Sequence, residues 1–428
     1  MKYINLIKLI LKLILFNIIV SKDLFEDYYE KASEILKTMS KYEKIGQLFF
    51  PRYSRETADY QLKKYFPAGF ILFANNLVNH TETELIEELN QIQNLSKIPL
   101  VFGVDEEGGT VCRISLYFRP EKFPSPRESF IKGGISEILS IEKEKINLLK
   151  KLKFNVNFAP VADISVNSSD YIYARTLGEN ASITSEYINS VVDLYEKGTL
   201  TCCLKHFPGY GNNRNTHDDI THDYRSLDYL KQNDLIPFIN AINHKVPMIM
   251  ASHNIVMEID NEYPSSISKK VHDLLRDEYG YTGLIVTDSL SMGAITKYSK
   301  NISAAVLAIM AGNDMIVTST FEDHINELIK AVDNNEIDIS LIEKAAKRVI
   351  AWKLKYIYEQ ENNGKNNKNN KKIILFIFLG VGIFGIILIL SFLLYKYKNR
   401  NKDKSENEEK DIEEKNNEGL IRDTNNSK

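Results

Sequence analysis

The stretch KHFPGYGNNRNTHDD, from Lys205 to Asp219, gathers a lysine, two histidines and two carboxylates around a Pro-Gly-Tyr-Gly turn. Histidine and carboxylate side chains can ligate a metal, histidine can also move protons near neutral pH, and the same residue types are common in solvated loops. The spacing of His217 and His222 matches no usual pair of helix-borne ligands. The spacing therefore argues against a metal site, and an acid/base loop and a polar surface loop both stay open.

A second candidate is Asp288, in the sequence GLIVTDSLSMGAI, where strand-forming residues are followed at once by a carboxylate and then by small residues. A carboxylate on a rigid strand end can attack an anomeric carbon and hold a covalent glycosyl intermediate. The alternative is that Asp288 caps the next helix, and for a lone aspartate this is the commoner role.

Four further residues could border a binding pocket. Asp105, beside a Gly-Gly pair, could accept hydrogen bonds from hydroxyls, and Arg175 could donate them. Lys205 and His206 are adjacent, so both can face one site only if the chain twists there, because successive strand residues point to opposite faces. Taken singly, each has an ordinary explanation: a solvated turn, a surface arginine, a solvated lysine or a buried histidine.

The elements that must position these residues alternate along the chain between short apolar runs and longer segments of helical period. The expected strands are Ile45 to Phe50, Gly69 to Phe73, Leu100 to Val104, Val156 to Ile164, Thr199 to Leu204, Met248 to Ser252, Leu284 to Thr287 and Met315 to Thr318. The expected helices are Glu82 to Ile92, Glu137 to Leu152, Ser185 to Glu196, Leu227 to Ile242, Ser268 to Tyr279 and Ser303 to Ala311. Eight strands separated by helices predict an α/β fold, a (β/α)8 TIM-type barrel. A doubly wound sheet is the competitor, but no glycine-rich dinucleotide fingerprint follows the first strand.

The barrel makes a prediction about the reactive residues, since active sites of such barrels lie at the carboxyl ends of the strands. The reactive side chains do follow strands: Asp105 the third, Asp163 the fourth, Lys205 and His206 the fifth, Ser252 and His253 the sixth, and Asp288 the seventh.

Five motifs together resemble family-3 glycoside hydrolases, in particular the bacterial single-domain β-N-acetylhexosaminidases. They are GVDEEGGTV, NFAPVADI, YARTLGE, KHFPGYG and TDSLSMGAI, in the order and spacing of that family. The resemblance runs from about Ser40 to Tyr358. It implies a retaining exo-glycosidase that removes terminal, non-reducing β-linked N-acetylglucosamine from a carbohydrate substrate without a cofactor.

The resemblance also implies roles for the site residues. The residue matching Asp288 is the nucleophile, and the residue matching His217 is the acid/base on the loop after the fifth strand, which departs from the usual two-carboxylate scheme. The residues that would hold the terminal sugar are Asp105, Arg175, Lys205 and His206.

One position departs from the family pattern. Relatives place an aspartate two residues before the acid/base histidine, whereas this chain has Asn215 before His217. An aspartate would fix the histidine tautomer and stabilise its charged form, and losing such a carboxylate costs on the order of 10² to 10⁴ in rate. Asp218 and Asp219 follow directly and could replace it. A catalytically impaired, sugar-binding pseudoenzyme is therefore the main alternative, ahead of a β-glucosidase or a metal-dependent hydrolase.

The two ends of the chain predict a membrane protein. Residues 1–21 read as a signal peptide, with an uncleaved anchor as the alternative. Residues 373–395 are apolar, uncharged and flanked by lysines, so they predict a transmembrane helix. Residues 359–372 form an Asn/Lys-rich stalk, and residues 396–428 a mixed-charge, disordered cytoplasmic tail. The catalytic domain, residues 22–358, would then lie outside the cell or in a lumen, as in a single-pass type I protein.

The composition limits the classes of molecule that this protein could bind. A net charge of −3 with no basic patch argues against nucleic acid. Three cysteines in a domain of this size predict a fold that depends on its core rather than on disulfides. Within the predicted catalytic domain, five glycosylation sequons suit a secreted glycoprotein, at Asn79, Asn94, Asn167, Asn180 and Asn301. The oligomeric state and the natural glycan, whether from peptidoglycan, chitin or glycoproteins, stay open.

Overall fold

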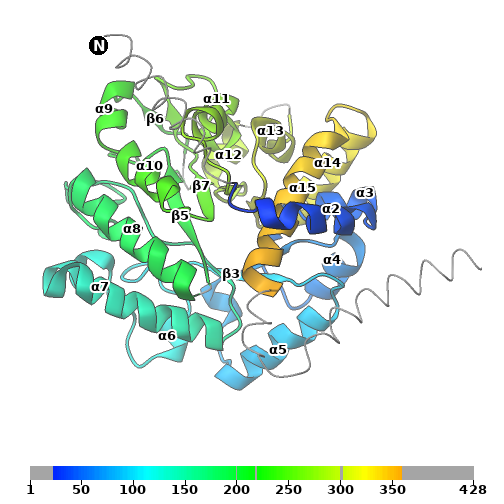
Figure 1. The fold of residues 1–428 in the computed structure, drawn as a ribbon, viewed down its shortest axis with the longest axis horizontal. Coiled ribbons are helices and arrows are strands. Elements are labelled where there is room, and N and C mark those ends of the chain that lie inside the picture. The colour runs from blue at the N-terminus through cyan, green and yellow to red at the C-terminus, as the bar shows by residue number, and fades with distance from the viewer. Residues whose placement is uncertain (1–22, 199, 217–218, 299–301, 359–428) are drawn as a thin grey trace, which may run out of the picture. The chain divides into compact units, whose positions relative to one another are not determined.

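A computed structural model describes residues 23–358 apart from residues 199, 217–218 and 299–301. Eight short parallel strands form the centre of the described chain (Figure 1). They are β1 (Phe49–Pro51), β2 (Gly69–Leu72), β3 (Val101–Val104), β4 (Val156–Asn157), β5 (Thr201–Phe207), β7 (Met248–Ala251), β9 (Leu284–Thr287) and β10 (Ile316–Thr318).

The strands close into a ring. Six of them pair in the order β2-β3-β4-β5-β7-β9, and β1 pairs with β10. Parallel bridges between Arg52 and Ile71 and between Val286 and Met315 join these two groups at both edges. The predicted α/β TIM-like barrel is thus confirmed, and the carboxyl ends of all eight strands face the same way.

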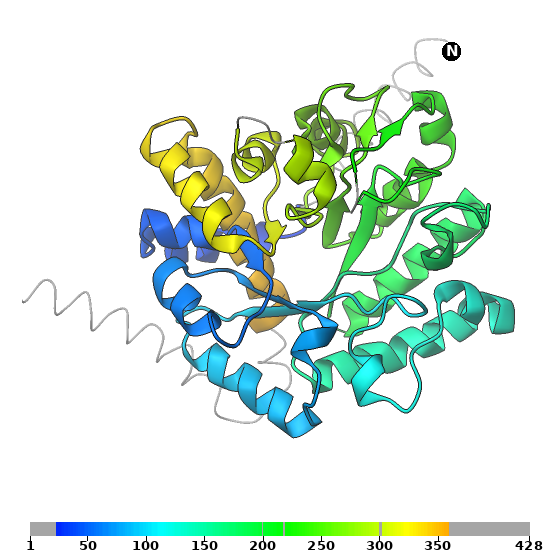
Figure 2. The same cartoon turned by 180° about the vertical axis from the view of Figure 1, so that it is seen from behind.

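Helices surround the ring (Figures 1 and 2). The longer ones are α2 (Tyr29–Lys37), α4 (Ala58–Tyr65), α5 (Glu82–Asn94), α7 (Pro126–Lys151), α8 (Ala181–Gly198), α10 (Leu235–Asn243), α13 (Ala304–Ala311), α14 (Phe321–Asp333) and α15 (Ile339–Lys353). The shorter ones are η1 (Glu26–Tyr28), α3 (Lys41–Gly46), η2 (Ala74–Asn76), α6 (Ser115–Phe118), η3 (Tyr173–Arg175), α9 (Leu227–Gln232), η4 (Ser265–Ile267), α11 (Lys269–Asp273), η5 (Leu274–Glu278), α12 (Gly293–Tyr298) and η6 (Leu354–Tyr358). A small sheet of β6 (His222–Asp223) and β8 (Ile255–Val256) lies outside the ring.

Local sequence explains where these elements begin. Helices α5 and α7 each start with a capping box, in which Thr81 and Ser125 accept the N–H of the glutamate three residues later. Pro126 occupies the first turn of α7, where a missing N–H costs nothing. All four residues of β2, β3, β7 and β9 are buried, which is why these strands read as continuous apolar runs rather than as alternating ones.

Several predicted boundaries were wrong. The first expected strand began at Ile45, but Ile45 ends up in α3, which the Ser40 capping box starts. The fourth strand stops at Asn157 because Pro160, shortly after it, has no N–H for a ladder. The fifth runs on to Phe207, so Lys205 and His206 lie inside it rather than after it.

Two helix predictions also changed. The helix expected over residues 227–242 is divided into α9 and α10, because the backbone of Asn233 is not helical. The helix α7 starts eleven residues before its expected beginning at Glu137, and Gly133 and Gly134 break its helical geometry.

Within the described residues no helix combines the length and apolar character needed to cross a bilayer. The predicted signal peptide, stalk, transmembrane helix and tail lie outside them.

Candidate active site

Lys205 of β5 lies between two carboxylates that follow β3. Its Nζ is 2.7 Å from Asp105 Oδ1 and 2.6 Å from Glu107 Oε1. The lysine and Glu107 side chains are both buried, whereas Asp105 keeps partial exposure. A buried ammonium with two charge-assisted partners is held in one position, which leaves Asp105 as the oxygen-bearing group open to a ligand.

Arg175, at the end of η3, joins the same cluster. Its guanidinium donates two hydrogen bonds to Glu107, from Nε at 2.9 Å and from a terminal nitrogen at 2.7 Å. The same terminal nitrogen is 3.3 Å from His206 Nε2. The peptide bond between Lys205 and His206 is cis, and both side chains contact the cluster. The structure therefore brings Asp105, Arg175, Lys205 and His206 together, and their sugar-binding role stays a prediction.

The charges within the cluster set its pKa values. Burial alone would raise the pKa of Glu107, but Arg175 and Lys205 outweigh it and hold that pKa well below its ordinary value. Burial would lower the pKa of Lys205, yet Asp105 and Glu107 raise it. The cluster therefore remains an ionised, compensated network at neutral pH.

Glu107 is a site residue that the sequence analysis missed. It is fully desolvated, and it is the acceptor that holds both Arg175 and Lys205. A signal for it exists in the sequence: in VDEEGG it stands two residues after Asp105, and residues at that spacing share one face of an extended chain. The intervening Glu106 serves the loop instead, accepting the N–H groups of Arg113 and Ile114.

Asp288 directly follows β9 and is half-buried. Its Oδ1 accepts the N–H of Ser289 at 2.7 Å, and the carbonyl of Ser289 lies 2.9 Å from His253 Nε2. Burial raises the pKa of the Cys203 thiol, and the nearby charges of Lys205, Asp105 and Asp288 also act on it. Asp288 thus lies at the carboxyl end of its strand, as Asp105 and Lys205 do at the ends of β3 and β5.

The loop after β5 is described in part. Asn215 is half-buried, Thr216 is buried and Asp219 is exposed. His217 and Asp218 lie outside the described residues, so the acid/base role of His217 stays a prediction. The backbone of Thr216 is held on both sides: its N–H donates to the Tyr210 hydroxyl at 2.8 Å, and its carbonyl accepts the Ala294 N–H at 3.2 Å.

The part of the chain that the structure describes contains no cluster of side chains suited to bind a metal ion. No group of three or more histidine, cysteine, aspartate or glutamate side chains there is arranged to hold an ion. The three cysteines are buried and unpaired, Cys112 included. The carboxylates of the cluster are instead neutralised by cationic side chains.

A barrel that gathers acidic and basic side chains at the carboxyl ends of its strands has the arrangement of a TIM-barrel enzyme. Residues 41–352 match the family described as "Glycosyl hydrolase family 3 N terminal domain". The chain belongs to glycosyl hydrolase family 3.

Named relatives agree with this family. The chain is 28% identical to "Beta-hexosaminidase A" of Pseudoalteromonas piscicida over 69% of its own length and 54% of that protein. It is 27% identical to "Beta-hexosaminidase" of Nitrosomonas eutropha, over 72% of this chain and 89% of that protein. Among solved structures it is similar to a family 3 beta-N-acetylglucosaminidase from Paenibacillus, with a TM-score of 0.70 and 26% identity, over 74% of this chain and 63% of that one. The chain thus spans about half of the first relative and under two thirds of the solved structure.

Proposed function

We propose that this chain is a retaining exo-glycosidase that removes terminal, non-reducing β-linked N-acetylglucosamine from a glycan or oligosaccharide. The observation that carries the proposal is the compensated cluster of Asp105, Glu107, Arg175, Lys205 and His206, at the end of a family 3 barrel where Asp288 also follows its strand. Relatives named beta-hexosaminidase and beta-N-acetylglucosaminidase support the choice of sugar.

The sugar-binding part of the proposal follows from hydrogen-bonding capacity. Asp105 is the partly exposed acceptor of the cluster, and its position is fixed by Lys205. Arg175 borders the same side chains and supplies hydrogen-bond donors for hydroxyls, and His206 contacts that guanidinium beside the proposed sugar position. Such convergent polar groups on rigid strands orient one sugar ring against the carboxylate that must attack it.

In the proposed reaction the Asp288 carboxylate attacks the anomeric carbon and forms an ester bond to it. The glycosidic C–O bond breaks, and the leaving oxygen takes a proton from His217. In the second step His217 removes a proton from water, whose oxygen displaces Asp288 from the anomeric carbon. The two inversions restore the β configuration.

We also propose a location. Residues 1–21 as a signal peptide and residues 373–395 as a membrane anchor would make this a single-pass type I protein with its barrel outside the cell or in a lumen. The four sequon asparagines within the described residues are exposed, as glycan attachment requires: Asn79, Asn94, Asn167 and Asn180.

An aryl glycoside assay tests the activity. The protein should release chromophore from an aryl β-N-acetylglucosaminide faster than from the matching β-glucoside, and Asp288→Ala should abolish release while leaving the fold intact. Faster turnover of the β-glucoside would favour a β-glucosidase instead. Loss of activity on chelation would favour a metal-dependent hydrolase.

Asn215 is the one feature that favours the sugar-binding pseudoenzyme, because a family aspartate is replaced by a neutral amide. Measurable binding of N-acetylglucosamine without turnover of any glycoside would establish that alternative. Asn215→Asp should raise turnover if His217 is the acid/base and no other carboxylate serves it. An unchanged rate would assign the partner role to Asp218 or Asp219.

A further inference from the structure

Asp163 is a buried carboxylate that the sequence analysis placed at a strand end without giving it a role. It follows β4, and none of its side chain is exposed. Its two oxygens accept N–H groups from two residues of the β5 end: Oδ2 lies 2.6 Å from His206 Nδ1, and Oδ1 lies 2.7 Å from the backbone nitrogen of Tyr210. The backbone nitrogen of His206 adds a longer contact to Oδ1, at 3.3 Å.

The contact to His206 determines which ring nitrogen carries the proton. A guanidinium can only donate, so Arg175, at 3.3 Å from Nε2, requires that Nε2 accept. Nδ1 must then bear the hydrogen, which it donates to Asp163. Asp163 and Arg175 together fix both the tautomer and the orientation of the imidazole that borders the proposed sugar position.

The contact to Tyr210 extends to the segment just before His217. The Tyr210 hydroxyl accepts the N–H of Thr216 at 2.8 Å and donates to the carbonyl of Arg214 at 3.0 Å. Burial raises the pKa of Tyr210 to about 12, so the hydroxyl keeps its proton. The Tyr210 ring also packs edge-on against His206, with ring centres 5.7 Å apart.

We propose that Asp163 is a positioning residue that holds two functional parts of the site in register: the sugar-binding imidazole of His206 and, through Tyr210, residues 214–216 that lead directly to His217. This rests on the proposed glycosidase function. Asp163 would touch no substrate atom. Thr216 is also bonded to Ala294 in α12, the helix that starts shortly after Asp288, so the same segment is tied to the nucleophile side of the site.

A carboxylate is required at position 163, because every neighbour of its oxygens is a donor. In Asp163→Asn one end of the side chain becomes NH₂. If the NH₂ faces Tyr210, two donors oppose each other at the backbone. If it faces His206, the ring must move its proton to Nε2, where it opposes the Arg175 guanidinium. Either orientation of the amide therefore disturbs the His206 ring or the Tyr210 contact to residues 214–216.

The first experiment does not depend on activity. Arg214 is exposed, and the bond after it is a trypsin site whose carbonyl the Tyr210 hydroxyl binds. Under native conditions, Asp163→Asn and Tyr210→Phe should speed cleavage after Arg214 at least about tenfold relative to other sites, since local opening exposes the bond. Tyr224→Phe is the matched control, because it removes a tyrosine hydroxyl from a side chain that is 76% exposed.

The second experiment compares kcat/KM on aryl β-N-acetylglucosaminides with good and poor leaving groups. Tyr210→Phe should lower kcat/KM about tenfold for a methoxyphenyl leaving group, which needs protonation, and less than about twofold for a dinitrophenyl group, which does not. Asp163→Asn should lower it about 100-fold with both, because the His206 ring that contacts Arg175 beside the proposed sugar position is also displaced.

The two experiments separate the two hypotheses. If the wild-type protein hydrolyses no glycoside, the proposed function fails, while the trypsin result still decides whether Asp163 holds the Tyr210 segment. Cleavage of Asp163→Asn at the wild-type rate would overturn the proposal. If Asp163→Asn does not fold, 15N NMR of the His206 side chain in the wild-type protein replaces it, with the signals assigned by comparison with His206→Gln. A proton on Nδ1 supports the proposal. An unprotonated Nδ1 contradicts it.

Discussion

Two lysines of this barrel are equally buried and yet respond to burial in opposite ways. Lys205 contacts two carboxylates near the carboxyl end of β5, and they raise its pKa. Lys353, at the end of α15, donates to the side-chain oxygen of Gln47 at 2.8 Å, and burial lowers its pKa to about 7. Burial penalises both ammonium groups, so the difference shows that nearby charge, rather than depth, decides whether a buried lysine stays charged.

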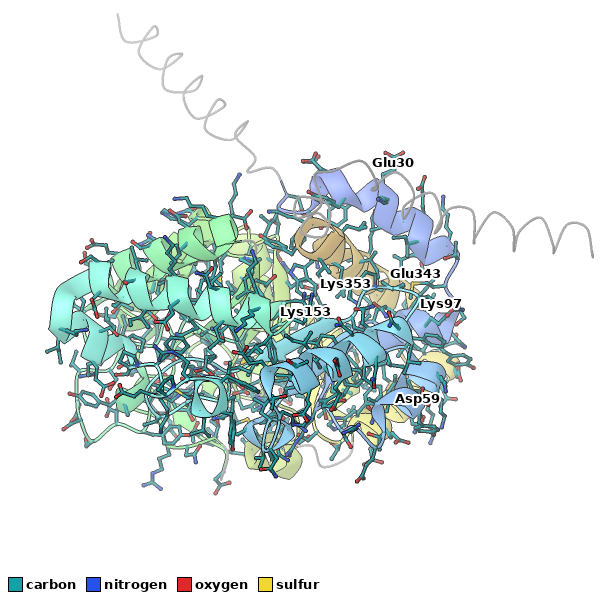
Figure 3. The ribbon with its side chains drawn as sticks, turned by 90° about the horizontal axis from the view of Figure 1, so that it is seen from below. Glu30, Asp59, Lys97, Lys153, Glu343 and Lys353 are labelled. Atoms are coloured by element: carbon teal, nitrogen blue, oxygen red, sulfur yellow. The ribbon has the colours of Figure 1, made fainter. Side chains whose placement is uncertain are left out.

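The two lysines also occupy opposite ends of the barrel. Gln47 precedes β1, and Trp352, next to Lys353, donates to the hydroxyl of Thr201, the first residue of β5. In Figure 3 Lys353 lies near the middle of the molecule, whereas Glu30, Asp59 and Lys97 lie at its edge. Lys353 thus belongs to the amino-terminal floor of the barrel, where residues contribute to stability rather than to chemistry. Lys205 at the functional end is paired with carboxylates, whereas Lys353 at the other end contacts an uncharged amide.

Among the changes considered, neutralising Glu107, the carboxylate that pairs with Arg175 and Lys205, should have the largest effect on the free energy of unfolding. Glu107→Gln leaves Arg175 without its carboxylate and Lys205 with only Asp105. Breaking a buried ion pair by changing one partner typically costs about 3–5 kcal/mol, so we expect a loss of that size in the free energy of unfolding, measured in urea at pH 7. The affinity for the sugar should fall in the same variant, because Arg175 and Lys205 lose the carboxylate that positions them.

An exposed ion pair provides the control for this loss. Glu278 pairs with Lys231 at 2.9 Å, and the two side chains are 49% and 40% exposed. Glu278→Gln should therefore change the free energy of unfolding by less than about 1 kcal/mol. If Glu107→Gln unfolds at the same urea concentration as Glu278→Gln, the cluster is not the compensated network that its distances indicate.

Replacing Lys353, whose charge has no carboxylate partner among its contacts in the described chain, should change the free energy of unfolding in the opposite direction. Lys353→Met replaces the ammonium with an apolar chain of similar length, and should stabilise the protein by about 2–4 kcal/mol at pH 6 to 7. The unfolded chain keeps the lysine protonated up to the ordinary pKa of 10.5, whereas the native protein releases that proton near pH 7. Between these pH values the unfolded state binds more protons, so the wild type gains stability as pH rises and its difference from Lys353→Met shrinks.

The measurement is urea unfolding of both proteins from pH 6 to pH 9. Lys344→Met, an exposed change on the same helix, should leave the pH dependence of the wild type unaltered. The raised pKa of Lys205 cannot mimic the effect, because its stabilising contribution is lost only above the ordinary lysine pKa. A pH-independent difference between wild type and Lys353→Met would show that Lys353 stays charged in the folded protein.

The contrast also explains what could be predicted from the sequence. The barrel and the meeting of Asp105, Lys205 and His206 were predictable, because these residues lie at strand ends and the carboxyl ends of parallel strands converge. Glu107 was missed although its spacing from Asp105 marks a shared face, because two adjacent glutamates before Gly-Gly resemble a solvated turn. Lys353 could not be found: a lysine in the last turn of a helix normally interacts with the helix dipole in solvent. Only the tertiary position of α15 buries it.

The smallest effect should come from giving Lys353 the kind of partner that Lys205 has. Gln47→Glu places a carboxylate where the amide oxygen now lies 2.8 Å from the ammonium, which should raise the Lys353 pKa and flatten the rise in stability between pH 7 and pH 9. At pH 7 the net change should be within about 1 kcal/mol, because the new ion pair is offset by the lost hydrogen bond from the Gln47 amide to the carbonyl of Phe66. Gln47→Met loses the same amide without adding charge, so it should keep the steep pH dependence. Equal slopes for the glutamate and methionine variants would mean that the charge of the partner does not control Lys353, and that the difference between the two ends of the barrel has another cause.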